Sequence, residues 1–155
     1  MLSVCAWNVN GLQSKVLGDK TKYVDFLDIV TKHDFTFLTE TWTNTIPKIS
    51  NYECVCAAPQ KQINSKKRRQ SGRKSGGICL FYKERFRNQI ELVKSAHNFI
   101  WCKISKKIVD NQNDLFICGI YIPPDNSKYV NNDIFNQLES DINFFYEKRI
   151  CFIIR

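Results

Sequence analysis

The chain has 155 residues, the length of one ordinary domain. Its composition, with 43% hydrophobic and 25% charged residues, excludes disordered, collagen-like and low-complexity chains. It contains neither a long uninterrupted apolar run nor a basic leader with a cleavage site. The sequence therefore predicts an intracellular protein, nuclear or cytoplasmic, that is not secreted and has no membrane partner.

The net charge of +8 is concentrated in one stretch, residues 60–77, which we call the basic segment. It contains no acidic residue, and its basic residues are Lys61, Lys66, Lys67, Arg68, Arg69, Arg73 and Lys74. Such a run is typical of a solvated loop, and equally of a nuclear-localisation or phosphate-binding patch. Because no aromatic residue interrupts it, contact with nucleic acid would be to the backbone.

The seven cysteines are an odd number, and most lie in apolar runs. This pattern predicts free, buried thiols in a reducing compartment and no disulfide-linked partner. Cys54 and Cys56 have C-x-C spacing, and neither His33 nor His97 lies near another thiol pair, so the spacing does not predict a zinc site.

The first forty residues predict a β-α-β unit. An apolar strand at 2–7 runs into a polar turn at 8–11, and a second apolar strand at 35–39 ends on Glu40. Between them Asp19 is expected to cap a helix whose apolar face is Tyr23, Phe26, Leu27 and Val30. Asn8 and Glu40 then follow the carboxyl ends of neighbouring strands.

The rest of the chain alternates short apolar runs with turns. Strands are predicted at 52–57, 78–82, 90–93, 99–104 and 115–122, of which the last four are expected to form an antiparallel meander. Asn132 is expected to cap a helix with an apolar face at Phe135, Leu138, Ile142 and Phe145. The run 150–154 is apolar enough for a central strand, and because a central strand requires neighbours, the chain is expected to be cut after Arg155.

Polar side chains that chemistry can use collect at the predicted strand ends, namely Asn8, Asn10, Glu40 and Tyr121. Amide and carboxylate oxygens suit a magnesium ion, and amide and phenol hydrogens suit phosphate oxygens. The same residues also have explanations that involve no function. Asn8 and Asn10 fit an ordinary turn, Glu40 fits a cap for the segment that follows, and Tyr121 fits a half-buried core position.

Four segments then resemble one family in its own motif order: 6–12 (Ala-Trp-Asn-Val-Asn-Gly-Leu), 37–42 (Phe-Leu-Thr-Glu-Thr-Trp), 75–78 (Ser-Gly-Gly-Ile) and 119–124 (Gly-Ile-Tyr-Ile-Pro-Pro). They resemble the endonuclease/exonuclease/phosphatase superfamily, and within it the apurinic-endonuclease-like domain of non-LTR (LINE-type) retrotransposons. The resemblance implies an α+β fold, a four-layer sandwich of two mixed sheets flanked by helices. Residues 1–155 would be the N-terminal part of one such domain, incomplete at the C-terminus.

The resemblance also implies magnesium-dependent hydrolysis of phosphodiesters, with DNA as the partner. Glu40 would be a metal ligand, Asn8 would help to hold the metal and the phosphate, and Tyr121 would donate to the scissile phosphate as negative charge develops on it. Asn10 would contact DNA or the metal shell. The basic segment would contact DNA through residues 66–69, Arg73 and Lys74, whereas His33 and His97 match no family motif and are expected to be structural or solvated.

The departure from the family concerns the later motifs. Family members continue with Gly-Asp-x-Asn and Ser-Asp-His, and neither motif occurs in this sequence. Because the members of a catalytic group act together, the 155-residue chain is predicted to be an inactive fragment of a DNA-nicking enzyme. Glu40 is one remaining carboxylate without its partners, so weak or absent magnesium binding is expected. A non-catalytic nucleic-acid-binding module and an unfolded remnant are the alternatives. The sequence leaves the oligomeric state open.

Overall fold

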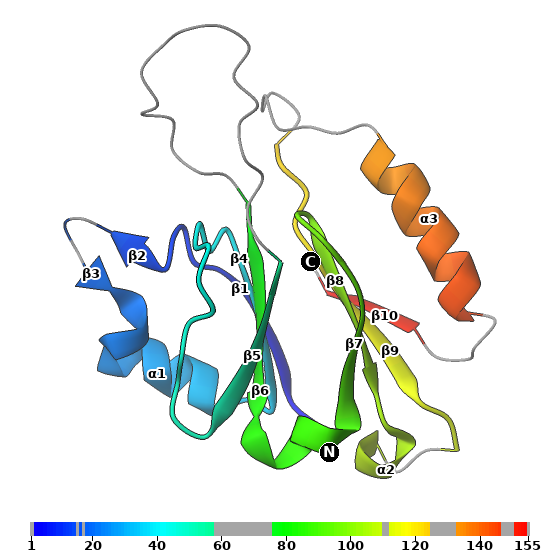
Figure 1. Ribbon diagram of the computed structural model, residues 1–155, viewed down its shortest axis with the longest axis horizontal. Helices are drawn as coiled ribbons and strands as arrows, with labels where there is room; N and C mark the ends of the chain where they lie inside the picture. The colour runs from blue at the N-terminus through cyan, green and yellow to red at the C-terminus, as the bar shows by residue number, and fades with distance from the viewer. Residues whose placement is uncertain are drawn as a thin grey trace, which may run out of the picture.

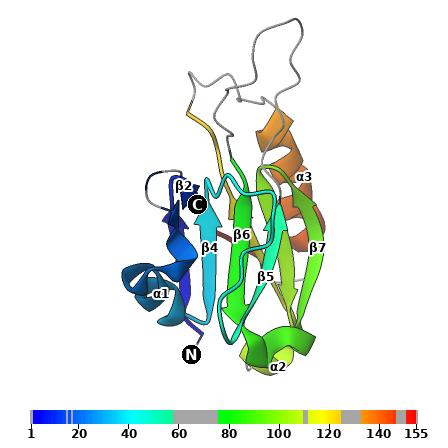
Figure 2. The same ribbon diagram turned by 60° about the vertical axis from the view of Figure 1, so that its left-hand side comes forward.

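A computed structural model describes residues 2–14, 16, 18–57, 76–109, 112–124, 133–146 and the backbone of 151–154. These residues form two four-stranded sheets and one two-stranded hairpin (Figure 1). The sheets stand face to face, α1 (Val24–Thr31) covers the outer side of the first, and α3 (Asp133–Tyr146) covers the outer side of the second. Figure 2 shows the same layers after a turn of 60°.

The first sheet has the strand order β1-β4-β6-β5. Its strands are β1 (Val4–Asn8), β4 (Phe35–Thr39), β6 (Ile78–Lys83) and β5 (Tyr52–Ala57). β1 runs parallel to β4, to which α1 connects it, and the other two pairings are antiparallel. The predicted β-α-β unit is therefore confirmed, and it makes the sheet mixed.

The second sheet has the order β10-β9-β8-β7. Its strands are β10 (Cys151–Ile154), β9 (Leu115–Ile120), β8 (Phe99–Ile104) and β7 (Ile90–Ala96). β7, β8 and β9 form the predicted meander, but the expected inclusion of 78–82 was wrong: β6 pairs within the first sheet, and the 3-10 helix η2 (Glu84–Gln89) connects it to β7. The predicted strand at 150–154 is present as β10, which in the described residues pairs in parallel with β9.

Side chains alternate between an inner and an outer core, as the two-residue period of a strand requires. Phe37 of β4 and Ile100 of β8 lie in the core between the sheets. Leu38, the neighbour of Phe37, instead packs with the α1 residue Phe26 on the outer side. On the opposite outer side Trp101 packs against Phe145 of α3, with ring centroids 4.7 Å apart. The result is the predicted sandwich of two mixed sheets flanked by helices.

One glycine permits the close approach of the two sheets. A Cβ at Gly119 of β9 would lie 2.1 Å from the Phe37 ring, closer than any real carbon contact. The Phe37 side chain therefore fills the space that a larger residue at 119 would occupy. Gly119 lies two residues before Tyr121, so this contact packs the two sheets together near Tyr121.

Two short features precede α1. The hairpin of β2 (Gln13–Ser14) and β3 (Gly18–Asp19) leads into the 3-10 helix η1 (Lys20–Lys22). Asp19 caps η1 by accepting the Thr21 N–H at 3.0 Å, so the expectation that it caps α1 was wrong. Tyr23 then starts α1 without a side-chain cap.

The second half of the described chain also contains the helices α2 (Lys106–Val109) and α3. The helix α2 follows β8. The predicted cap Asn132 lies outside the described residues, and the helix itself is present with Phe145 buried and Phe135 exposed. None of the helices in the described part of the chain is long and apolar enough to cross a membrane.

Candidate active site at the end of the sandwich

Three loops of the first sheet are joined by backbone hydrogen bonds beyond the ends of their strands. The Gly11 N–H donates to the Glu40 carbonyl at 2.7 Å, and Leu12 donates to Thr41 at 2.9 Å. On the other side of the Glu40 loop, the Thr41 N–H donates to Gly77 at 3.2 Å. The resembling segments 6–12, 37–42 and 75–78 therefore meet through their described residues at one sheet edge.

The second sheet contributes the fourth segment. The Tyr121 N–H donates to the Asn98 carbonyl at 2.8 Å, which anchors the residue just after β9 to the β7–β8 turn. A Cβ at Gly76 would lie 3.8 Å from both the Tyr121 ring and the His97 carbonyl. Tyr121 therefore lies next to the loops of the first sheet.

The side chains of Glu40 and Tyr121 are in direct contact. The Tyr121 hydroxyl donates to Glu40 Oε1 at 2.6 Å, across 81 residues of sequence and between the two sheets. Tyr121 is 9% exposed, and Glu40 is half-buried. The phenol orients the carboxylate, and the carboxylate remains partly open to solvent, as a ligand-binding group must be.

The backbone of these loops is unusual. Of the eight described residues with positive φ, six lie here: Asn10, Gly11, Glu40, Trp42, Gly76 and Gly77. Glutamate at φ 53° is costly, and such residues persist where surrounding contacts enforce them, most often at functional sites. Position 11 requires glycine for a second reason, because a Cβ there would lie 2.4 Å from the Trp42 ring.

The two asparagines occupy the neighbouring strand end. Asn8 pairs with Thr39 in the parallel register, and its Oδ1 accepts the Asn10 N–H at 3.0 Å. Both side chains are exposed at this edge. The sequence reasoning missed Lys20, whose Nζ donates to the Val9 carbonyl at 2.5 Å and supports this loop from η1.

The donor set fits part of a magnesium site. Magnesium commonly takes one or two carboxylates and completes its shell with water and substrate phosphate. Glu40 offers a carboxylate and Asn8 an amide oxygen at the same edge, both hard ligands. In the described ranges no further carboxylate or imidazole joins Glu40 in a group of three.

The other sequence-predicted residues have different outcomes. His97 is near the site, and its Nε2 is buried without a hydrogen-bond partner among the described residues, as is Nδ1 of His33. The basic residues Lys66, Lys67, Arg68, Arg69, Arg73 and Lys74 lie outside the described residues. Their described flanks, Ala57 and Gly76, are at the same sheet edge as Glu40.

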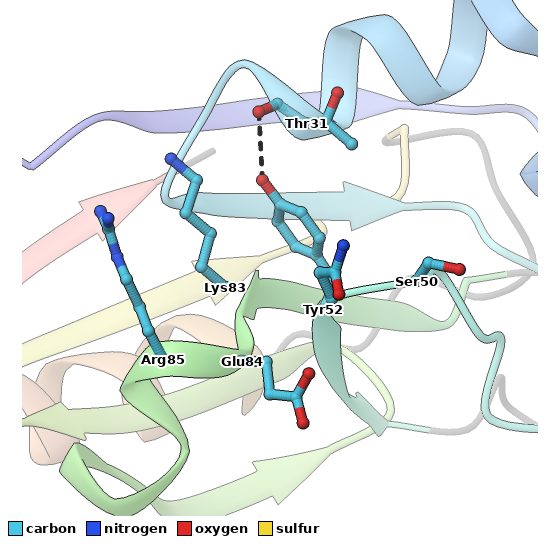
Figure 3. Close-up of a pocket in the computed structure, with 7 residues that line it drawn as sticks. Thr31, Ser50, Tyr52, Lys83, Glu84 and Arg85 are labelled. Atoms are coloured by element: carbon cyan, nitrogen blue, oxygen red, sulfur yellow. Dashed lines mark hydrogen bonds between the residues drawn. The ribbon is translucent and has the colours of Figure 1, made fainter.

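A hollow lies at the end of the first sheet opposite Glu40 (Figure 3). It has a volume of about 530 Å³, and Tyr52, Lys83 and Arg85 are among the residues that line it. Asp34 forms ion pairs with both cations, with distances of 2.9 Å to Lys83 Nζ and 2.8 Å to an Arg85 nitrogen. Both cations are therefore already engaged by the protein, although these three side chains together keep a net positive charge.

Asp34 is the centre of a structural network. It is buried and also accepts the Ser3 N–H and hydroxyl, each at 3.0 Å. Burial alone would raise the pKa of Asp34, but the hydrogen bonds from Lys83 and Ser3 outweigh burial and lower the pKa to about 2. The network joins the N-terminal segment to β4 and β6.

Comparisons with known proteins identify the family and agree with the fold. The model of the endonuclease/exonuclease/phosphatase family matches residues 5–144. The fold is similar to the catalytic domain of human Nocturnin, solved with bound sulfate (10% identity, TM-score 0.56), and to TDP2 of D. rerio, solved with a single-stranded DNA product (14% identity, TM-score 0.53). Each comparison covers 98% of this chain but only 62% and 58% of the two structures. No curated protein matches the sequence.

Proposed function

Because the chain belongs to the endonuclease/exonuclease/phosphatase family, we propose that it supplies the metal- and phosphate-binding part of a phosphodiesterase site that acts on DNA. The motifs it shares with retrotransposon endonucleases favour a role in nicking target DNA. One observation carries this proposal: the hydrogen bond between Tyr121 and Glu40, which joins two motif residues from different sheets.

Each side chain has a task in this proposal. Glu40 and Asn8 would hold a magnesium ion, which supplies positive charge to a bound phosphate and acidifies a bound water. Tyr121 donates its single hydroxyl hydrogen to Glu40 and so keeps the carboxylate in one orientation. To stabilise a developing negative charge on a phosphate, that hydrogen would have to turn from the carboxylate to the phosphate oxygen. Asn10, exposed on the neighbouring loop, would contact the DNA backbone.

Hydrolysis needs groups beyond these. Activation of the water and protonation of the leaving group are the tasks of Gly-Asp-x-Asn and Ser-Asp-His in the family, and the 155 residues contain neither motif. We therefore assign binding without turnover to this chain by itself. Loss of acid-base help alone costs on the order of 10²- to 10⁴-fold in rate.

A DNA-binding titration tests the binding half of the proposal. Fluorescence anisotropy of a labelled oligonucleotide, measured with and without magnesium, should show tighter binding with the ion. Glu40→Gln should abolish the magnesium effect. The control Glu139→Gln removes the same charge from an exposed position on α3 and should leave the effect intact. A magnesium effect that survives in Glu40→Gln contradicts the assignment.

A plasmid assay tests the absence of turnover. Supercoiled plasmid incubated with the chain and magnesium should stay supercoiled. Nicking that disappears in Glu40→Ala would refute the assignment of binding without turnover, while still supporting Glu40 as a functional residue.

A non-catalytic nucleic-acid-binding module is the second candidate, favoured by the charge of the basic segment and by its attachment beside Glu40. Phosphate contacts release counterions, so replacement of residues 66–69 by serine should flatten the salt dependence of DNA binding. Binding that depends on these four residues and not on magnesium favours this candidate over the first.

A further inference from the structure

Three cysteine side chains converge on the outer face of the first sheet, away from the Glu40–Tyr121 pair. Cys54 and Cys56 lie two residues apart on β5 and so share a face, and Cys79 of β6 is directly opposite Cys56. The Sγ atoms of Cys54 and Cys56 are 3.4 Å apart, and those of Cys56 and Cys79 are 2.6 Å apart. All three Sγ atoms lie within 4.8 Å of one another, and the described residues hold no second group of this kind.

This arrangement differs from ordinary packing of thiols in a core. Cys102 and Cys118 are fully buried in separate apolar clusters, and burial raises the pKa of Cys102 to about 12. In the group of three, only Cys79 is buried, whereas Cys54 and Cys56 are half-buried on the edge strand. The group therefore lies at the margin of the apolar cluster beside α1 and is not enclosed in the core between the sheets.

The spacing suits one small soft ion. With metal–sulfur bonds of about 2.3 Å, two sulfur atoms on a tetrahedral ion are about 3.8 Å apart. The separations of 3.4 and 2.6 Å are both shorter than that value, so the side chains would rotate apart to hold an ion. Because the backbones belong to paired strands, the sulfur atoms are held together before any ion binds.

The surroundings supply an unsatisfied polar group. The Thr41 hydroxyl is buried, lies beside the Cys79 thiol, and has no hydrogen-bond partner of good geometry among the described residues. A buried hydroxyl without a partner beside a thiol cluster is an oxygen that could approach a bound ion.

We propose that Cys54, Cys56 and Cys79 form a binding site for one thiophilic d¹⁰ ion, Zn²⁺ or Cu⁺. Three thiolates complete the shell of Cu⁺, whereas Zn²⁺ needs a fourth ligand, for which water is available at the exposed edge. Binding converts the three thiols to thiolates and releases their protons, so three metal–sulfur bonds replace three S–H bonds. No electron transfer is involved.

The test uses the whole chain, reduced with a non-thiol reductant. Titration with Cd²⁺ should produce thiolate-to-metal charge-transfer absorption that saturates at one ion per chain. Competition with chelators then compares Zn²⁺ with Cu⁺, the latter without oxygen. Cys54→Ser should weaken binding at least tenfold. Cys5→Ser, which changes another half-buried cysteine of the same sheet, should leave binding unchanged.

A thermal melt separates loss of the site from loss of the fold. The ion should raise the Tm of the wild type and of Cys5→Ser, because it binds only the folded chain. Cys54→Ser, at a half-buried position, should melt at the wild-type temperature without metal and gain nothing from the ion. Absence of binding by the reduced protein, equal loss in Cys5→Ser, or formation of a Cys56–Cys79 disulfide in place of ion binding would overturn the proposal.

Discussion

Two carboxylates at opposite ends of the same strand have opposite environments. Asp34 immediately precedes β4, and Glu40 immediately follows it. Asp34 accepts hydrogen bonds from Ser3, Lys83 and Arg85, while the one side-chain donor to Glu40 in the described part of the chain is Tyr121. Glu40 also has the costly left-handed backbone, at φ 53°.

The contrast separates a structural carboxylate from one available to a ligand. Asp34 has exchanged water for fixed donors on every side, so its charge contributes to folding. Glu40 retains solvent contact and receives one oriented donor, and its strained backbone contributes nothing to stability. Local satisfaction of hydrogen bonds therefore indicates which end of the strand carries chemistry.

The largest expected effect concerns the packing that closes the sandwich at the Glu40 end. Gly119→Ala should destabilise the protein by about 3 kcal/mol, because its Cβ would overlap the Phe37 ring. Urea unfolding measures the change. The double variant Gly119→Ala with Phe37→Leu should cost less than the sum of the two single variants. Full additivity would show that the ring contact is not the cause.

The second effect compares the carboxylates directly. Asp34→Asn should lower the free energy of unfolding by about 2 kcal/mol, because its charge-assisted hydrogen bonds are lost. Glu40→Gln should change it by less than about 0.5 kcal/mol, since the amide oxygen can still accept from Tyr121. Equal losses in the two variants would remove the distinction between the two ends.

The third effect is a pH dependence confined to the Asp34 end. The pKa of Asp34 lies near 2 in the folded protein, below its ordinary value of 3.8. The stabilisation is therefore complete above about pH 4 and is lost as the pH falls toward 2. Thermal melts across this range should show a steeper decline for the wild type than for Asp34→Asn. Parallel declines would contradict the assignment.

The smallest effect is the loss of the hydrogen bond between the sheets. Tyr121→Phe should cost about 1 kcal/mol by urea unfolding, because the ring keeps its packing and only the hydroxyl disappears. In the anisotropy titration, the same variant should weaken the magnesium effect on DNA binding. A variant that loses stability but keeps the full magnesium effect would make Tyr121 a structural residue only.

Sequence reasoning predicted features that depend on local pattern. The strand-end rule placed Glu40 and Tyr121 at carboxyl ends, and the structure brings both to one edge, where their roles stay predictions. Sequence reasoning did not predict that β6 pairs within the first sheet. The short spacing between β6 and the next strand favours a meander, and only packing in the core determines which of the two sheets a strand joins. Likewise, the C-x-C spacing places Cys54 and Cys56 close together in the sequence. Cys79 is 23 residues from Cys56 and comes close to it only through strand pairing, which the spacing does not predict.

The contact between Tyr121 and Glu40 also constrains the order of folding. Its partners are 81 residues apart and belong to different sheets, so neither sheet can form the pair by itself. Contacts of such long sequence separation form after the loop entropy of the intervening chain has been overcome. The geometry of this site is consequently among the last features to appear as the chain folds, and a partly folded chain with both sheets formed but undocked would lack it.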